Sequence, residues 1–106
     1  MSITSKCVAE LLGTFVFVLV ILFSIKWLNK NNAPFIVPCA IAVGLVAGIL
    51  ICLGMNGDAH LNPAVSGAFY AKGDLNLKQL CCYSGSQIVG ALLAFVVYKY
   101  SNQYSR

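Results

Sequence analysis

Three apolar runs, each about twenty residues long, constrain this chain more than any other feature of its sequence. They cover residues 8–28, 35–55 and 80–100, and short polar stretches separate them. About 20 apolar residues in a helix cross the ~30 Å hydrocarbon core of a bilayer. Only 9% of the residues are charged, whereas soluble domains carry about 25%. We therefore predict an all-α integral membrane protein with three transmembrane helices, in which residues 1–106 form a single unit in the lipid bilayer.

The first run has an alternative interpretation as a signal peptide, because Lys6 precedes an apolar region. The run is long, however, and no Ala-x-Ala-like cleavage site precedes Lys26 and Trp27. These features favour a membrane span, for which Trp27 would serve as an interfacial anchor.

Residues 57–70 (GDAHLNPAVSGAFY) form a fourth fairly apolar stretch that is too short to cross a bilayer. Pro63 suits the first position of a helix, and Asn62 before it is a preferred N-cap residue. The five residues that lead into this helix span up to about 3.5 Å each, so they reach about halfway through the hydrocarbon core. The pattern predicts a re-entrant half-helix whose positive dipole end lies near the membrane midplane.

The sequence HLNPAV at residues 60–65 resembles the signature of the aquaporin and glycerol-facilitator family, the major intrinsic proteins. Its tripeptide is Asn62, Pro63 and Ala64, and Val65 after it resembles the first of the family's two repeats, since the second typically has Arg there. Residues 9–15 (AELLGTF) and 87–91 (QIVGA) resemble the family's first and third helices.

The resemblance covers nearly the whole chain but only half of a family member, which consists of two three-span repeats in inverted topology. It implies a channel for water or small neutral solutes, and pores that assemble as tetramers. Chains of this length would then need up to eight copies. The family's narrow filter combines a second-span aromatic before a Gly with the Arg after the second tripeptide. The matching positions here are Val43 and Val65, which predicts a wider and more apolar constriction.

Four polar side chains in the apolar stretches are candidates for support of the re-entrant segment or for the pore. Glu10 either accepts hydrogen bonds from the backbone of residues 57–61, as the resemblance also implies, or complements the helix dipole near interfacial water. Gln87 either meets the same segment or bonds to a neighbouring helix. We expect His60 to brace the loop, because no second metal ligand has usable spacing. Asn62 can cap the half-helix and also direct its amide into a pore.

Small residues predict where the helices pack closely. Gly44 and Gly48 form a GxxxG pair in the second run, and Gly90 lies between Ser86 and Ala94 in the third. The five cysteines show no metal-ligand spacing, so we interpret them as small buried hydrophobes. Acylation of the two adjacent cysteines, Cys81 and Cys82, is the alternative.

We expect no enzyme, because no nucleophile–base pair, carboxylate pair or phosphate-binding loop is recognisable. We also expect no cofactor, metal or nucleic-acid partner. The favoured hypothesis is a passive channel for water or small neutral solutes, formed by antiparallel self-association. The alternatives are a non-conducting or truncated membrane subunit, and a channel whose other half is a separate polypeptide.

Basic residues are balanced between the two membrane faces: Lys6, Lys72 and Lys78 on the N-terminal face, and Lys26, Lys30, Lys99 and Arg106 on the other. Balanced charge permits insertion in both orientations.

Overall fold

The computed structural model describes residues 2–28, 31 and 33–104 of the 106-residue chain. Within these residues it contains helices and no strands. The helices are α1 (Ile3–Trp27), α2 (Ile36–Gly54), α3 (Pro63–Lys72) and α4 (Leu77–Tyr104). Three of them, α1, α2 and the Leu77–Asn102 part of α4, are long and apolar enough to cross a membrane. The prediction of three spans and one short helix is therefore confirmed.

Two of the helices extend beyond the apolar runs because polar residues cap them. The helix α1 begins at Ile3, where the Ser2 hydroxyl accepts a hydrogen bond from the N–H of Ser5. The helix α4 begins at Leu77 behind a reciprocal capping box. In it, Asn76 Oδ1 accepts from the N–H of Gln79, and Gln79 Oε1 accepts from the N–H of Asn76, both at 2.8 Å.

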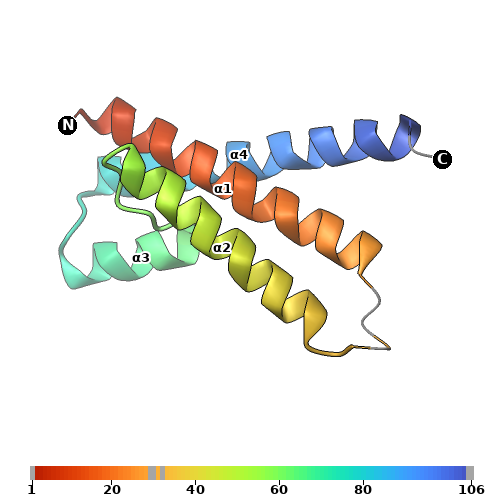
Figure 1. Cartoon of the computed structure of the whole chain (residues 1–106). Helices are drawn as coiled ribbons and strands as arrows, with labels where there is room; N and C mark the ends of the chain where they lie inside the picture. The colour runs from red at the N-terminus through yellow and green to blue at the C-terminus, as the bar shows by residue number, and fades with distance from the viewer. Residues whose placement is uncertain (1, 29–30, 32, 105–106) are drawn as a thin grey trace.

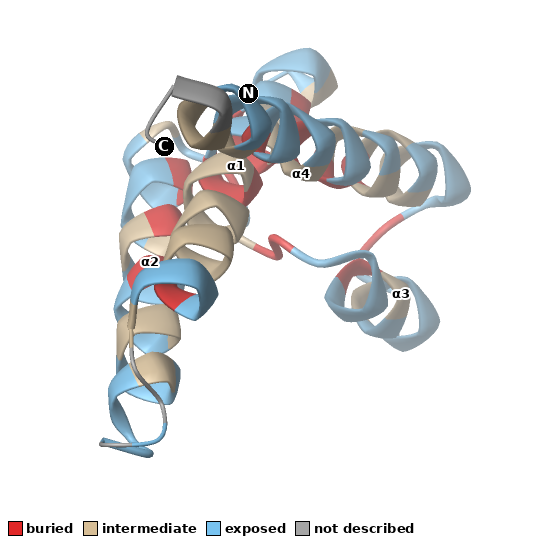
Figure 2. Cartoon of the chain, turned by 90° about the vertical axis from the view of Figure 1, so that its right-hand side faces the viewer, coloured by how far each residue is buried: buried red, intermediate tan, exposed pale blue. Residues whose placement is uncertain are grey.

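The first helix is the common support of the fold (Figure 1). The helix α2 packs along one side of α1 and α4 along another, and α3 packs against α4. No packing joins α2 to α3 among the described residues, and Figure 2 shows α3 standing apart from α2 at the end of the segment that connects them. The fold therefore has an open side between α2 and α3.

Glycines let the backbones of α1 and its two neighbours approach closely. A methyl group added at Gly48 would lie 2.6 Å from the carbonyl oxygen of Gly13, and one added at Gly44 would lie 2.6 Å from Val20. A methyl group at Gly90 would lie 2.4 Å from the carbonyl oxygen of Leu11. The three glycines chosen from the sequence thus all lie at contacts with α1, as small residues do in tightly packed membrane helices.

We predict that Gly90→Ala lowers stability whereas Gly85→Ala on the same helix does not. The new methyl group at residue 90 meets backbone, which cannot rotate away, so α1 and α4 must separate at a cost of about 1–3 kcal/mol. The methyl group at residue 85 meets no heavy atom within 4 Å and should only improve helix propensity. Thermal unfolding in detergent measures the difference. Equal melting temperatures for the two variants would contradict this account of the α1–α4 contact.

Candidate functional site

The segment between α2 and α3 has an unusual backbone. Three of its non-glycine residues lie in the left-handed region: Asn56 with φ 61°, Ala59 with φ 58° and Leu61 with φ 57°. Side chains with a Cβ rarely adopt this region, and each such residue typically costs about 1–3 kcal/mol. Three within six positions persist only because contacts with the helices fix the segment.

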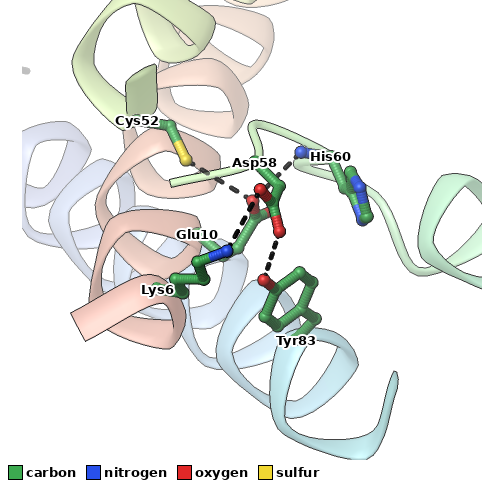
Figure 3. A network of polar contacts seen from close by, with 6 residues as sticks. All are labelled: Lys6, Glu10, Cys52, Asp58, His60 and Tyr83. Carbon is green, nitrogen blue, oxygen red and sulfur yellow. Dashed lines mark hydrogen bonds and ion pairs between the residues drawn. The ribbon is translucent and has the colours of Figure 1, made fainter. Parts of the chain in front are cut away.

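The first such contact is with the Glu10 carboxylate of α1, which is fully buried. Its Oε2 accepts a hydrogen bond from the N–H of His60 at 3.0 Å (Figure 3). Its Oε1 accepts one from the N–H of Leu61 at 2.8 Å. Left-handed residues at alternate positions turn successive N–H groups toward one acceptor. The carboxylate thereby satisfies donors that have no helical partner and would be costly to leave unpaired in an apolar medium.

Two further donors reach the same carboxylate. Gln87 Nε2 of α4 donates to Oε1 at 2.9 Å, and Cys52 Sγ of α2 donates to Oε2 at 3.4 Å. Groups from the other two long helices and from the connecting segment thus converge on Glu10 of α1. Charge-assisted hydrogen bonds are roughly twice as strong as neutral ones, so four donors offset much of the cost of burying a carboxylate.

His60 and Ser66 form a second buried pair beside Glu10. His60 Nδ1 lies 2.9 Å from Ser66 Oγ, which also accepts from Gln87 Nε2 at 3.0 Å. The imidazole stacks on Phe69 with ring centroids 4.5 Å apart. Sequence reasoning missed Ser66, although it is the only polar residue between Pro63 and Tyr70 in the half-helix. It is fully buried, so this Ser–His contact braces α3 and offers no accessible nucleophile.

Asn62 marks the free end of the half-helix. Its Oδ1 accepts from the N–H of Ala64 at 2.9 Å, and its backbone is extended, as expected for an N-cap residue ahead of Pro63. Asn62, Pro63, Ala64 and Val65 are all exposed, although Leu61 before them is only 3% exposed. The side-chain carbonyl of Asn62 is therefore used for capping, and the residue is exposed.

The depth of this free end follows from its contacts with α1. A methyl group added at Gly13 would lie 2.6 Å from the side chain of Leu61. Gly13 lies about 15 Å from the start of α1 at 1.5 Å per residue, and that helix has 25 residues, or about 37 Å. The N-terminus of α3 therefore lies beside the middle part of α1, as measured along that helix.

Val43 and Val65 are not brought into the buried cluster. Val43 on α2 is 67% exposed, and Val65 in the first turn of α3 is 37% exposed. Both thus belong to the exposed surface of helices that do not pack against each other.

A second contact of the segment was not predicted from the sequence. Asp58 Oδ1 lies 3.5 Å from Lys6 Nζ of α1, and Tyr83 Oη of α4 donates to Asp58 Oδ2. Tyr83 is fully buried, whereas Asp58 is partly exposed. No spacing rule connects residues 6, 58 and 83, so no signal in the sequence could have found this contact.

The interpretation of the cysteines as small buried hydrophobes holds for Cys7 and Cys52, which are buried, and is wrong for the other three. Cys7 of α1 and Cys82 of α4 form a disulfide bond with Cα atoms 6.2 Å apart, so Cys82 is not free for acylation. Cys39 and Cys81 are exposed, and only Cys52 is both free and buried. The bond spans 75 residues and depends on the packing of α1 on α4, which the spacing of the cysteines does not reveal. The described residues include no group of three or more His, Cys, Asp or Glu that could hold a metal ion.

The sequence of this chain matches a known protein family. The family model "Major intrinsic protein" matches residues 1–105. The chain belongs to the major intrinsic protein family. The three spans and the half-helix are half of an aquaporin fold, and the chain is an integral, multi-pass membrane protein.

Individual relatives in the major intrinsic protein family are much longer than this chain. It is 40% identical to aquaporin NIP1-1 of Arabidopsis thaliana over 84% of its own length and 31% of that protein. It is 35% identical to aquaglyceroporin AqpS of Rhizobium meliloti, over 85% of the chain and 40% of that relative. It is 36% identical to aquaporin-8 of Rattus norvegicus, over 88% of the chain and 35% of that relative. The chain thus spans about a third of the length of the curated relatives it matches. No solved structure matches it.

We predict that Glu10→Ala destabilises the fold strongly, because it leaves the N–H groups of His60 and Leu61 buried without an acceptor. Each unsatisfied donor costs about 1–3 kcal/mol. The matched control is Asp74→Ala, which removes an exposed carboxylate that pairs only with Lys72 at 3.1 Å. Such surface pairs contribute about 0–1 kcal/mol. Melting temperatures in detergent distinguish the two variants, and an equal effect of both would show that Glu10 does not hold the segment.

Proposed function

We propose that the chain is half of a passive channel for water or small neutral solutes, completed by a second copy in antiparallel orientation. One observation carries the proposal: the N-terminus of α3 is exposed on the open side of the fold, beside the middle part of α1. The first turn of a helix leaves N–H groups without intrahelical partners, and its dipole end is positive. Such an end is not stable against lipid and requires a polar, water-filled environment.

The chemistry of this end favours neutral permeants. The Asn62 amide can donate a hydrogen bond to a passing oxygen atom, while the dipole of α3 repels cations. Two half-helices that meet head to head, each from one chain, would line both halves of such a path. Glu10, His60 and Gln87 support the path indirectly in this proposal, because they fix the segment that presents Asn62.

The constriction is proposed to be apolar. Val43 and Val65 lie on the exposed surfaces of α2 and α3, and neither can donate a hydrogen bond to a solute. A pore made from identical chains would then be wider and less polar at this point than a strict water channel. It would admit solutes such as small polyols.

The distribution of charge is compatible with antiparallel pairing. Lys6, Lys72 and Lys78 flank one face, and Lys26 and Lys99 flank the other together with Lys30 and Arg106, which lie outside the described residues. Orientation in the membrane follows the Lys and Arg bias of short loops, and here that bias is about zero. Family pores that assemble as tetramers would correspond to eight chains of this kind.

A non-conducting membrane subunit is the second candidate function. It is favoured by the open side between α2 and α3. A separate polypeptide could cover that side instead of a second copy, and the channel would then require both chains.

Reconstitution of the purified chain in liposomes tests the channel. We predict that osmotic shrinkage exceeds that of empty vesicles, that glycerol also enters, and that Asn62→Asp lowers both rates at least about tenfold. A carboxylate at the positive end of α3 would bind water and attract cations at the narrowest part of the path. Asn56→Asp, in the same segment but before the tip, is the control and should change the rates little. Inert vesicles containing well-folded protein would favour the non-conducting subunit, and strict exclusion of glycerol would contradict the apolar constriction.

Labelling from each side of the membrane tests the antiparallel pair. We predict that a cysteine introduced at Ser2 or at Ser105, in a background without Cys39 and Cys81, reacts about equally from both sides of sealed vesicles. Two lysines added to residues 29–32 should force one orientation and abolish transport, because orientation follows the charge bias. Coexpression with a variant that carries extra lysines near Gly73 should restore it. A single orientation of the parent chain would exclude self-pairing.

A further inference from the structure

Asp58 gives the re-entrant segment a second attachment, separate from Glu10. Its carboxylate contacts two helices at once, because Lys6 of α1 lies 3.5 Å from Oδ1 and Tyr83 of α4 donates to Oδ2 (Figure 3). Asp58 lies two residues before His60, at the start of the descending backbone. Glu10 lies one helical turn beyond Lys6 on α1, so the two attachments hold the segment at different depths.

The two partners of Asp58 are the chain neighbours of the disulfide bond. Lys6 immediately precedes Cys7, and Tyr83 immediately follows Cys82. The bond joins α1 to α4 within a small buried cluster made by Cys7, Leu75 and Tyr83. It therefore limits the distance between the two groups that hold Asp58, although their cysteine neighbours are 75 positions apart in the sequence.

We propose that the Cys7–Cys82 pair is a redox modification site that sets how firmly Asp58 holds the re-entrant segment. The reductant is a small dithiol. Its thiolate attacks Sγ of Cys82, the half-buried member of the pair, and Cys7, which is only 5% exposed, leaves as a thiolate. The second thiol of the reductant then displaces Cys82. In total one S–S bond breaks, Cys7 and Cys82 gain two electrons and two protons, and the dithiol becomes a disulfide.

Reduction loosens one attachment and leaves the other in place. Without the bond, side-chain packing and the hydrogen bond of Gln87 to Glu10 hold this part of α1 and α4 together. Lys6 and Tyr83, which lie nearer the starts of these helices, can then separate, and Asp58 loses one or both partners. The hydrogen bonds of Glu10 to His60 and Leu61 do not involve either cysteine. Residues 56–59 should therefore become mobile while the N-terminus of α3 keeps its position. An effect of this motion on permeation rests on the proposed channel, whereas the motion itself does not.

Hydrogen exchange of the full chain in detergent tests the site directly. We expect the amides of residues 56–59 to exchange about tenfold faster after reduction with dithiothreitol, the change that corresponds to loss of one charge-assisted hydrogen bond. The double variant Cys7→Ser, Cys82→Ser should show the fast exchange with and without dithiothreitol. Asp58→Asn should do the same although its disulfide remains. Cys81→Ser removes the adjacent exposed thiol and is the matched control, which should respond to reduction like the parent chain.

Three outcomes would overturn the proposal. Reaction of Cys7 and Cys82 with a maleimide in air-oxidised, denatured protein would show that the bond does not form. A bond that forms without any change of exchange at residues 56–59 on reduction would be a structural link only. A parent-like redox response of Asp58→Asn would show that the bond acts on the segment without Asp58.

Osmotic shrinkage of liposomes separates this proposal from the channel proposal. A shrinkage rate that changes on reduction in the parent chain and in Cys81→Ser, but not in the double variant, supports both. Vesicles that are inert in both redox states, together with redox-dependent exchange at residues 56–59, support the site and contradict the channel.

Discussion

The hydrogen bonds from the N–H groups of His60 and Leu61 to the Glu10 carboxylate are the interaction on which the rest of the structure depends. The backbone at these residues is left-handed on both sides of His60 and has no helical or strand partner, so within an apolar medium it needs a buried acceptor. Glu10 provides this acceptor at His60 and Leu61, where the chain turns into the half-helix. Because the turn is fixed there, the half-helix that follows begins beside the middle part of α1 and exposes its positive end.

Close packing and polar contacts are coupled through α1. A carboxylate can accept four donors only if the elements that carry them lie within a few ångströms of its helix, and Gly13, Gly48 and Gly90 make that approach possible. Gln87 lies on the same face of α4 as Gly90, and Cys52 lies on the same face of α2 as Gly48. The glycine contacts and the polar cluster are therefore one arrangement, in which each makes the other geometrically possible.

The open side of the fold, between α2 and α3, is not covered by any other described part of this chain. Residues 62–65 and Val43 are exposed, although the elements that carry them are otherwise packed on α1 and α4. An exposed helix N-terminus in the spanning region needs water, which requires further protein to exclude lipid. In the proposed channel a second chain supplies that protein, and the physical requirement is the same whether that chain is another copy or a different protein.

The sequence by itself determined the three spans, the start of the short helix at Pro63 behind Asn62, and the packing role of Gly44, Gly48 and Gly90, because each depends on local hydropathy, capping or helical spacing. It also drew attention to Glu10 as the one acid in an apolar run, but it left open whether this carboxylate meets the re-entrant backbone or interfacial water. Only the tertiary structure decided that question, and only it brought Ser66 to His60, Asp58 to Lys6 and Tyr83, and Cys7 to Cys82. These pairs, apart from the local contact of Ser66 with His60, join residues 25 to 75 positions apart. Hydropathy fixes which segments are helical, but the rotation of each helix about its axis, set by glycine contacts and the buried carboxylate, decides which side chains meet.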